Sequence, residues 1–99
     1  MTKPRVSIGL PVFNGDKYLA DVLDSLLSQS YPHFELIISD NASTDKTAEI
    51  CRGYINKDSR IRYIRHPENM GAAWNYNHVV GLAQGEYFKW AAHDDLYHP

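Results

Sequence analysis

The chain has 99 residues, of which 43% are apolar and 22% charged, and this composition suits one small globular domain. Its formal net charge of −2 gives no overall attraction to nucleic acids or anionic lipids, so we expect no nucleic-acid partner. The single cysteine, Cys51, excludes an intrachain disulfide, and no apolar run approaches the roughly 20 residues that span a bilayer. We therefore expect a cytoplasmic chain.

Four short apolar runs alternate with three segments of helical periodicity. We predict strands over residues 6–12, 34–39, 60–65 and 86–91, and helices from 16 to about 30, from about 44 to 56 and from about 72 to 83. Tyr31 and Pro32 end the first helix, because a residue that precedes proline avoids the α region. Ser43 or Thr44 is expected to cap the second helix, with Cys51 on its apolar side.

This order of elements predicts an α/β fold. Strands that are separated by helices form crossover connections, so we expect a mostly parallel sheet with helices on both faces, in the order β-α-β-α-β-α-β. The chain shows no internal repeat and no linker, and residues 1–99 are expected to form one unit.

Acidic side chains follow the second and fourth predicted strands. Asp40 comes directly after the second strand, and Asp94 and Asp95 come after the fourth, so the fold is expected to bring them to one cleft. Clustered carboxylates repel one another, and a divalent cation such as Mg²⁺ or Mn²⁺ relieves that repulsion. An Asp-Asp pair is also common at helix N-termini, which leaves a purely structural role open. The chain has no GxGxxG or GxxxxGK[ST] motif, so bound phosphates would be neutralised mainly by metal.

Several short motifs follow one another along the chain, each occurring once. They are Pro11-x-Phe13-Asn14, Gln29-Ser30-Tyr31, Asp40-Asn41-Ala42-Ser43-Thr44-Asp45, Asn69-x-Gly71, Gly85-Glu86-Tyr87 and His93-Asp94-Asp95 with Pro99. Together they resemble the start of the family 2 glycosyltransferases, which are inverting enzymes of GT-A fold. The resemblance implies a Rossmann-like, nucleotide-sugar-binding part of a GT-A domain, without the acceptor-binding half.

The resemblance also implies a role for individual positions. Asp40 would accept a hydrogen bond from the nucleotide base, Asp94 would bind the cation that holds the diphosphate, and Asp95 would support it or touch the donor sugar. The other nucleotide-binding positions implied are Pro11, Val12, Phe13, Asn14, Asn69 and Gly71. The donor is expected to be a UDP-sugar. The acceptor is expected to be the hydroxyl of a saccharide or a lipid-linked molecule, reached through the missing half.

Two positions depart from the family pattern. Ala92 replaces the first acid of the metal motif, and Trp74 replaces an arginine found in many members. We interpret Trp74 as a core residue, and His66 and His78 as loop or helix-surface residues. The catalytic base of the family is expected beyond Pro99, so no residue of this chain is assigned that role. We therefore expect weak donor binding without transfer, and self-association through surface that a second half would cover.

Two alternatives remain open. A receiver-type signalling domain has a similar sheet, but it needs an acidic pair after the first strand, where this chain has Pro11-Val12-Phe13-Asn14. A non-catalytic binding module of the same fold is favoured by the missing acid at Ala92 and by the missing half. In a longer enzyme, a peripheral position at the inner face of the membrane is expected.

Overall fold

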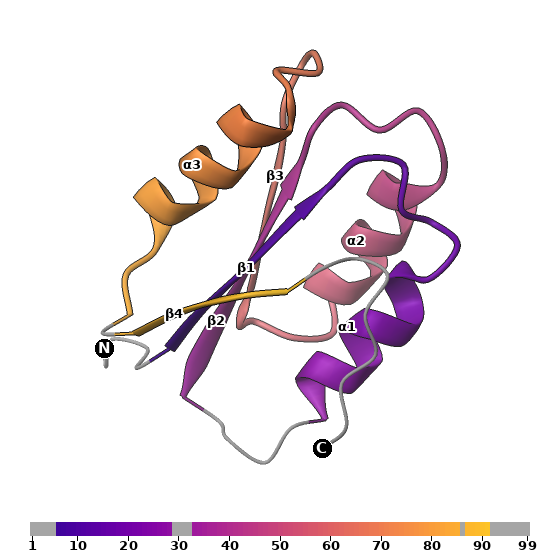
Figure 1. The fold of residues 1–99 in the computed structure, drawn as a ribbon. Coiled ribbons are helices and arrows are strands. Elements are labelled where there is room, and N and C mark those ends of the chain that lie inside the picture. The colour runs from indigo at the N-terminus through magenta and orange to yellow at the C-terminus, as the bar shows by residue number, and fades with distance from the viewer. Residues whose placement is uncertain (1–5, 29–32, 86, 92–99) are drawn as a thin grey trace.

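The computed structural model describes residues 6–28, 33–85 and 87–91. These residues form a four-stranded sheet flanked by helices (Figure 1). The strands are β1 (Val6–Val12), β2 (Phe34–Asp40), β3 (Ile61–Arg65) and β4 (Tyr87–Trp90), and the helices are α1 (Leu19–Leu27), α2 (Thr47–Ile55) and α3 (Ala72–Leu82). The predicted α/β fold and its order of elements are confirmed.

All neighbouring strands run parallel, in the sheet order β3-β2-β1-β4. Val12 at the end of β1 lies opposite Asp40 at the end of β2, and Asp40 lies opposite Arg65 at the end of β3. The loops that follow these three strands therefore leave the sheet at one edge. We call this the carboxyl edge, and it is where folds of this type bind their ligands.

The two faces of the sheet are covered by different helices, with α1 and α2 on one face and α3 on the other (Figure 1). The α1–α2 face is aliphatic. Its core contains Ile8, Leu10, Val12, Leu19, Val22, Leu23, Leu26, Leu36, Ile38, Cys51 and Ile61. The interpretation of Cys51 as a core residue is confirmed, and burial raises the pKa of its thiol to about 12.

The α3 face carries polar side chains at alternate strand positions. Glu35 of β2 is buried there and accepts hydrogen bonds from Ser7 Oγ at 2.6 Å, Gln84 N at 2.7 Å and Arg62 Nη1 at 3.0 Å. This network joins β1, β2, β3 and the segment after α3. Burial alone would raise the pKa of Glu35, but these hydrogen bonds and the charge of Arg62 hold it below its usual value.

Gly9 in the middle of β1 leaves room above the sheet for the side chains of Val79 from α3 and Phe88 from β4. A Cβ atom at this position would lie 2.5 Å from Val79 Cγ1 and 2.6 Å from Phe88 Cζ. Both distances are shorter than carbon atoms tolerate, so the close approach requires glycine here.

The start of the second helix differs from the prediction. α2 begins at Thr47 with Lys46 as its N-cap residue, and the side chain of Lys46 makes no capping hydrogen bond. The N–H of Thr47 donates instead to Asp45 Oδ1 at 2.9 Å. Ser43 and Thr44 therefore do not cap α2, because both bond to the loop after β1 instead.

Some predicted features lie outside the described residues. Tyr31, Pro32, Ala92, Asp94 and Asp95 fall in this group. Among the helices that the structure describes, none has the length and apolar character that crossing a membrane requires.

Candidate functional site

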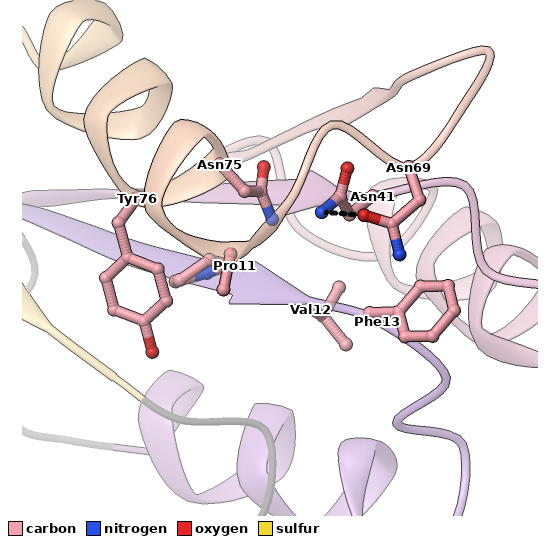
Figure 2. A pocket seen from close by; sticks show the side chains of 8 residues that line it. Pro11, Val12, Phe13, Asn41, Asn69, Asn75 and Tyr76 are labelled. Carbon is pink, nitrogen blue, oxygen red and sulfur yellow. Dashed lines mark hydrogen bonds between the residues drawn. The ribbon is translucent and has the colours of Figure 1, made fainter.

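A pocket of about 250 Å³ lies at the carboxyl edge of the sheet, between the end of β1 and the start of α3 (Figure 2). Its lining residues are Pro11, Val12, Phe13, Asn41, Asn69, Ala72, Asn75 and Tyr76. Sites for whole drug-sized molecules are typically about 300–1,000 Å³, so this pocket suits one part of a ligand, such as a planar base. Apolar and aromatic walls with a few amide groups offer both packing and directed hydrogen bonds.

The structure gathers some of the predicted nucleotide-binding residues and leaves others outside the pocket. Pro11, Val12, Phe13 and Asn69 line it, whereas Asn14, Asp40 and Gly71 do not. The predicted metal ligand Asp94 and its neighbour Asp95 lie outside the described residues.

Asn14 joins the loop after β1 to the loop after β2. Its backbone N–H donates to Ser43 Oγ at 2.8 Å, and its Oδ1 accepts from the Thr44 N–H at 2.8 Å. Asn14 has a φ of 51°, in the left-handed region that asparagine tolerates better than most residues. The next residue, Gly15, donates its N–H to Thr47 Oγ1 at 3.0 Å. Asn14 therefore fixes the loop that carries Phe13.

Two aspartates reinforce the same connection. The Asp16 N–H donates to Asp45 Oδ2 at 3.2 Å, and the Lys46 N–H donates to Asp16 Oδ2 at 3.2 Å. Burial opposes ionisation of Asp45, but bonds from Thr47 and Asp16 hold its pKa below the usual value. These acids therefore have a structural role in joining the two loops.

Asp40 is fully buried, with 0% of its surface exposed. Its Oδ1 accepts from the Ser43 N–H at 2.9 Å, and its Oδ2 accepts from the Tyr63 hydroxyl at 2.6 Å. Burial and the bond to Asp40 both raise the pKa of Tyr63. Side chains alternate along a strand, so Asp40 lies on the same face as Ile38, toward α1 and α2. Asp40 does not line the pocket.

Asn41, one residue later, lines the pocket and holds the loop before α3. Its Nδ2 donates to Asn69 Oδ1 at 2.9 Å (Figure 2). The same Nδ2 donates to Gly71 O at 3.2 Å, and Oδ1 accepts from the Met70 N–H at 2.8 Å. Gly71 has a φ of 90°, a conformation that glycine adopts without strain. The hydrogen bonds of Asn41 therefore hold the loop of the Asn69-x-Gly71 motif in place, and Asn69 in this loop forms part of the pocket wall.

Asn75 enters the pocket from the first turns of α3 and is 3% exposed. It is bonded to Ser39 of β2, and Ser39 is bonded to His66. His66 lies in the loop after β3, as predicted, but it is only 6% exposed and packs between Ser39 and the rings of Trp74 and His78.

The prediction that Trp74 is a core residue is wrong, since Trp74 is 37% exposed. Its ring stacks on His78 with centroids 4.8 Å apart and an interplanar angle of 9°, and its edge meets His66. Trp74 and His78 are four residues apart, so they lie on one side of α3, while Ala72, Asn75 and Tyr76 face the pocket.

Sequence reasoning missed four pocket residues, Asn41, Ala72, Asn75 and Tyr76. The alternation of apolar and polar residues in β2 would have indicated Asn41, because it separates Ser39 and Asn41 from Ile38 and Asp40. Within residues 6–28, 33–85 and 87–91, no group of three or more His, Cys, Asp or Glu side chains is arranged to hold a metal ion.

Comparison with known sequences identifies relatives over nearly the whole chain. The model of glycosyl transferase family 2 matches residues 7–99. An uncharacterized glycosyltransferase of Rickettsia typhi is 42% identical over 96 residues, which are 97% of this chain and 29% of the relative. TuaG of Bacillus subtilis, a glycosyltransferase named for teichuronic acid biosynthesis, is 42% identical over 94% of this chain and 37% of its own length. The chain thus spans well under half of these relatives.

Solved structures with the same fold include TarS and a mannosyltransferase. TarS from S. aureus, residues 1–349 in complex with UDP-GlcNAc, has a TM-score of 0.86 and 30% identity over 93% of this chain and 27% of its own. The mannosyltransferase PcManGT from Pyrobaculum calidifontis, in complex with GDP-Man and Mn²⁺, has a TM-score of 0.86 and 27% identity over 97% of this chain and 29% of its own. The predicted GT-A-type fold is confirmed by these structures.

Proposed function

The chain belongs to glycosyl transferase family 2, and on this basis we propose that residues 1–99 form the donor-binding part of an inverting glycosyltransferase. The full enzyme would move a sugar from a nucleotide donor, with a UDP-sugar as the expected form, to an acceptor hydroxyl. TarS in complex with UDP-GlcNAc supports a uridine donor.

The observation that carries this proposal is the pocket at the carboxyl edge. The end of β1 supplies Pro11, Val12 and Phe13 as apolar walls, and Phe13 is 44% exposed, which leaves its ring available for a ligand. Asn41 and Asn75 supply amide groups from the opposite side. A small pocket with apolar walls and a few directed polar groups suits a nucleotide base.

We assign the base contact to Asn41 rather than Asp40. Both carboxylate oxygens of Asp40 already accept hydrogen bonds, and its fully buried side chain does not line the pocket. An asparagine side chain has two N–H donors and two acceptor lone pairs. Asn69 and Gly71 accept from Nδ2 of Asn41, and the Met70 N–H occupies one lone pair of Oδ1. One acceptor position remains, which fits the imide N–H of uracil and not the unprotonated ring N3 of cytosine.

We also propose a divalent cation, Mg²⁺ or Mn²⁺, at Asp94, with Asp95 beside it. Carboxylate oxygens suit these hard ions, and PcManGT was solved with Mn²⁺. β4 runs parallel to β1 and therefore ends toward the carboxyl edge, shortly before Asp94 in the sequence. When bound, the ion would neutralise the charge of the departing nucleoside diphosphate. The chain's own contribution would be to hold the base and ribose in the pocket while the bond between the sugar and the diphosphate breaks.

The acceptor and the catalytic base belong to the full enzyme in this proposal. The acceptor is expected to be a saccharide or a lipid-linked molecule, and the base a carboxylate beyond Pro99 that takes the proton of the acceptor hydroxyl. The name of TuaG supports a role in polysaccharide synthesis. We expect the chain by itself to bind the donor without transferring sugar.

Titration calorimetry of the chain with UDP and Mn²⁺ tests the proposal. We expect binding by the unmodified chain, weaker binding of CDP, and at least tenfold weaker UDP binding by Asn41→Ala, because one hydrogen bond is lost and the loop at 69–71 is released. Asn77→Ala is the matched control, since Asn77 is an exposed residue of α3 that does not line the pocket. Absence of UDP binding, or equal binding by Asn41→Ala, would contradict the proposal and favour a non-catalytic module.

A further inference from the structure

We propose that His66 is a positioning residue for donor binding, because it fixes the amide of Asn75 in the pocket through the hydroxyl of Ser39. This inference rests on the proposed function of the pocket. It concerns three side chains from three different segments, namely the end of β2, the residue after β3 and the second turn of α3. We call them the His66–Ser39–Asn75 chain of hydrogen bonds.

Asn75 is held by two bonds to one residue. Its Nδ2 donates to the backbone oxygen of Ser39 at 2.9 Å, and its Oδ1 accepts from Ser39 Oγ at 2.5 Å. The backbone oxygen of Ser39 can only accept, so the nitrogen of the amide must face it and the oxygen must face the hydroxyl. The orientation of this amide is therefore determined by its partners.

The direction of the bond between Ser39 and His66 follows from the same count. A serine hydroxyl has a single proton, and that proton is donated to Asn75. Ser39 Oγ lies 2.8 Å from His66 Nε2, so it must accept there, and His66 must carry its proton on Nε2. The donor–acceptor sequence runs from His66 to Ser39 and from Ser39 to Asn75. Loss of the His66 donor would leave the hydroxyl free to turn away from Asn75.

The surroundings keep the His66 ring in place. Ser39 is 0% exposed and His66 is 6% exposed, so water does not compete with the bond between them. The His66 ring meets the Trp74 ring at 87° and the His78 ring at 80°, with centroids 4.8 Å and 4.9 Å away. These edge-to-face contacts hold the ring at the angle that aims Nε2 at Ser39.

The consequence for the pocket is a fixed pair of hydrogen-bonding groups. Asn75 lines the pocket, and after its two bonds to Ser39 it retains one N–H and one lone pair on Oδ1. A rotating amide would present either group to a ligand, whereas this one presents each at a set place. Such pre-orientation lowers the cost of binding a ligand with complementary polar edges.

The test compares UDP binding, with Mn²⁺ present, among variants of the chain. We expect His66→Leu and Ser39→Ala each to weaken UDP binding about tenfold, and the double variant to be no weaker than either single variant, since both break one chain of bonds. We expect His66→Gln to bind within about threefold of the unmodified chain, because its amide nitrogen replaces the Nε2 donor. His33→Gln is the control, as it makes the same substitution at an exposed histidine that precedes β2 and does not line the pocket.

Two results would overturn the positioning role alone. The first is UDP binding that His66→Leu leaves intact, and the second is an equal loss in His66→Gln and His66→Leu that follows their thermal unfolding temperatures. Absence of UDP binding by the unmodified chain would instead contradict the proposed function on which the inference rests.

Discussion

The two faces of the sheet divide stability from recognition. The α1–α2 face is built from aliphatic side chains such as Leu10, Leu23 and Ile38, all with 0% exposure. The α3 face holds buried polar groups, including Glu35 and Ser39. The helix that covers this second face supplies Ala72, Asn75 and Tyr76 to the pocket. The four-stranded sheet thus separates its aliphatic core from the face that carries hydrogen-bonded polar groups.

Burying polar groups is costly unless each one finds a partner. Within the part of the chain that the structure describes, no buried side-chain nitrogen or oxygen lacks a hydrogen bond. On the α3 face these bonds connect elements that are distant in sequence, such as Gly85 with Ser7 and Asn75 with Ser39. The polar face is therefore a positioning device, since each bond fixes a distance between two segments.

The largest effect that separates the faces is expected from Leu23→Ala on α1. This substitution leaves a cavity in the aliphatic core and should lower the free energy of unfolding by about 2–5 kcal/mol, while the chain that remains folded still binds UDP normally. Urea denaturation and calorimetry measure the two quantities. Val80→Ala is the control, because Val80 on α3 is 48% exposed and its loss should change stability by less than about 0.5 kcal/mol. A loss of UDP affinity as large as the loss of stability would contradict the division.

A smaller effect, with a distinct pH dependence, is expected from Glu35→Gln on the α3 face. The substitution keeps the shape and removes the charge, and we expect a loss of about 1–3 kcal/mol at pH 7. Because the pKa of Glu35 is lowered on folding, its ionised form stabilises the native state. That contribution is complete above the usual value of 4.5 and is lost as the pH falls through the lower value of the folded state.

Urea denaturation at pH 7 and at pH 3 checks this sign. The difference in stability between Glu35→Gln and the unmodified chain should shrink at pH 3, which lies below the usual pKa of 4.5, because the unfolded chain then holds a proton that the lowered pKa of Glu35 disfavours in the folded chain. Ser25→Ala on α1 serves as a neutral comparison at both pH values. A difference that stays constant or grows at low pH would show that the charge of Glu35 does not stabilise the fold.

The sequence predicted the elements well because each has a strong local pattern. Apolar residues at helical spacing mark α1, and short apolar runs mark β1 and β2. The pocket was predicted in part, since Pro11, Val12 and Phe13 lie at or next to the end of β1, where the family resemblance placed nucleotide-binding positions. Residues whose place depends on strand ends alone were therefore within reach of sequence reasoning.

The remaining site residues depend on contacts between distant segments. Asp40 is the last residue of β2 and Asn41 follows it directly. Because side chains alternate along a strand, Asp40 points toward α2, where the Tyr63 hydroxyl and the Ser43 N–H donate to it. Asn75 reaches the pocket from α3, which is distant in the sequence from the ends of β1 and β2, and no local pattern marks it. His66 follows a strand and looks like a loop residue, yet Trp74 and His78 of α3 cover it.

The central claim is that the amides between the loop after β2 and the start of α3 surround a nucleotide base. The most direct measurement follows the side-chain amide signals of the asparagines by NMR while UDP and Mg²⁺ are added. The account predicts that the signals of Asn41, Asn69 and Asn75 move together, while those of Asn14 and Asn56, which do not line the pocket, stay in place. Signals of Asn41, Asn69 and Asn75 that do not respond to saturating UDP would contradict it.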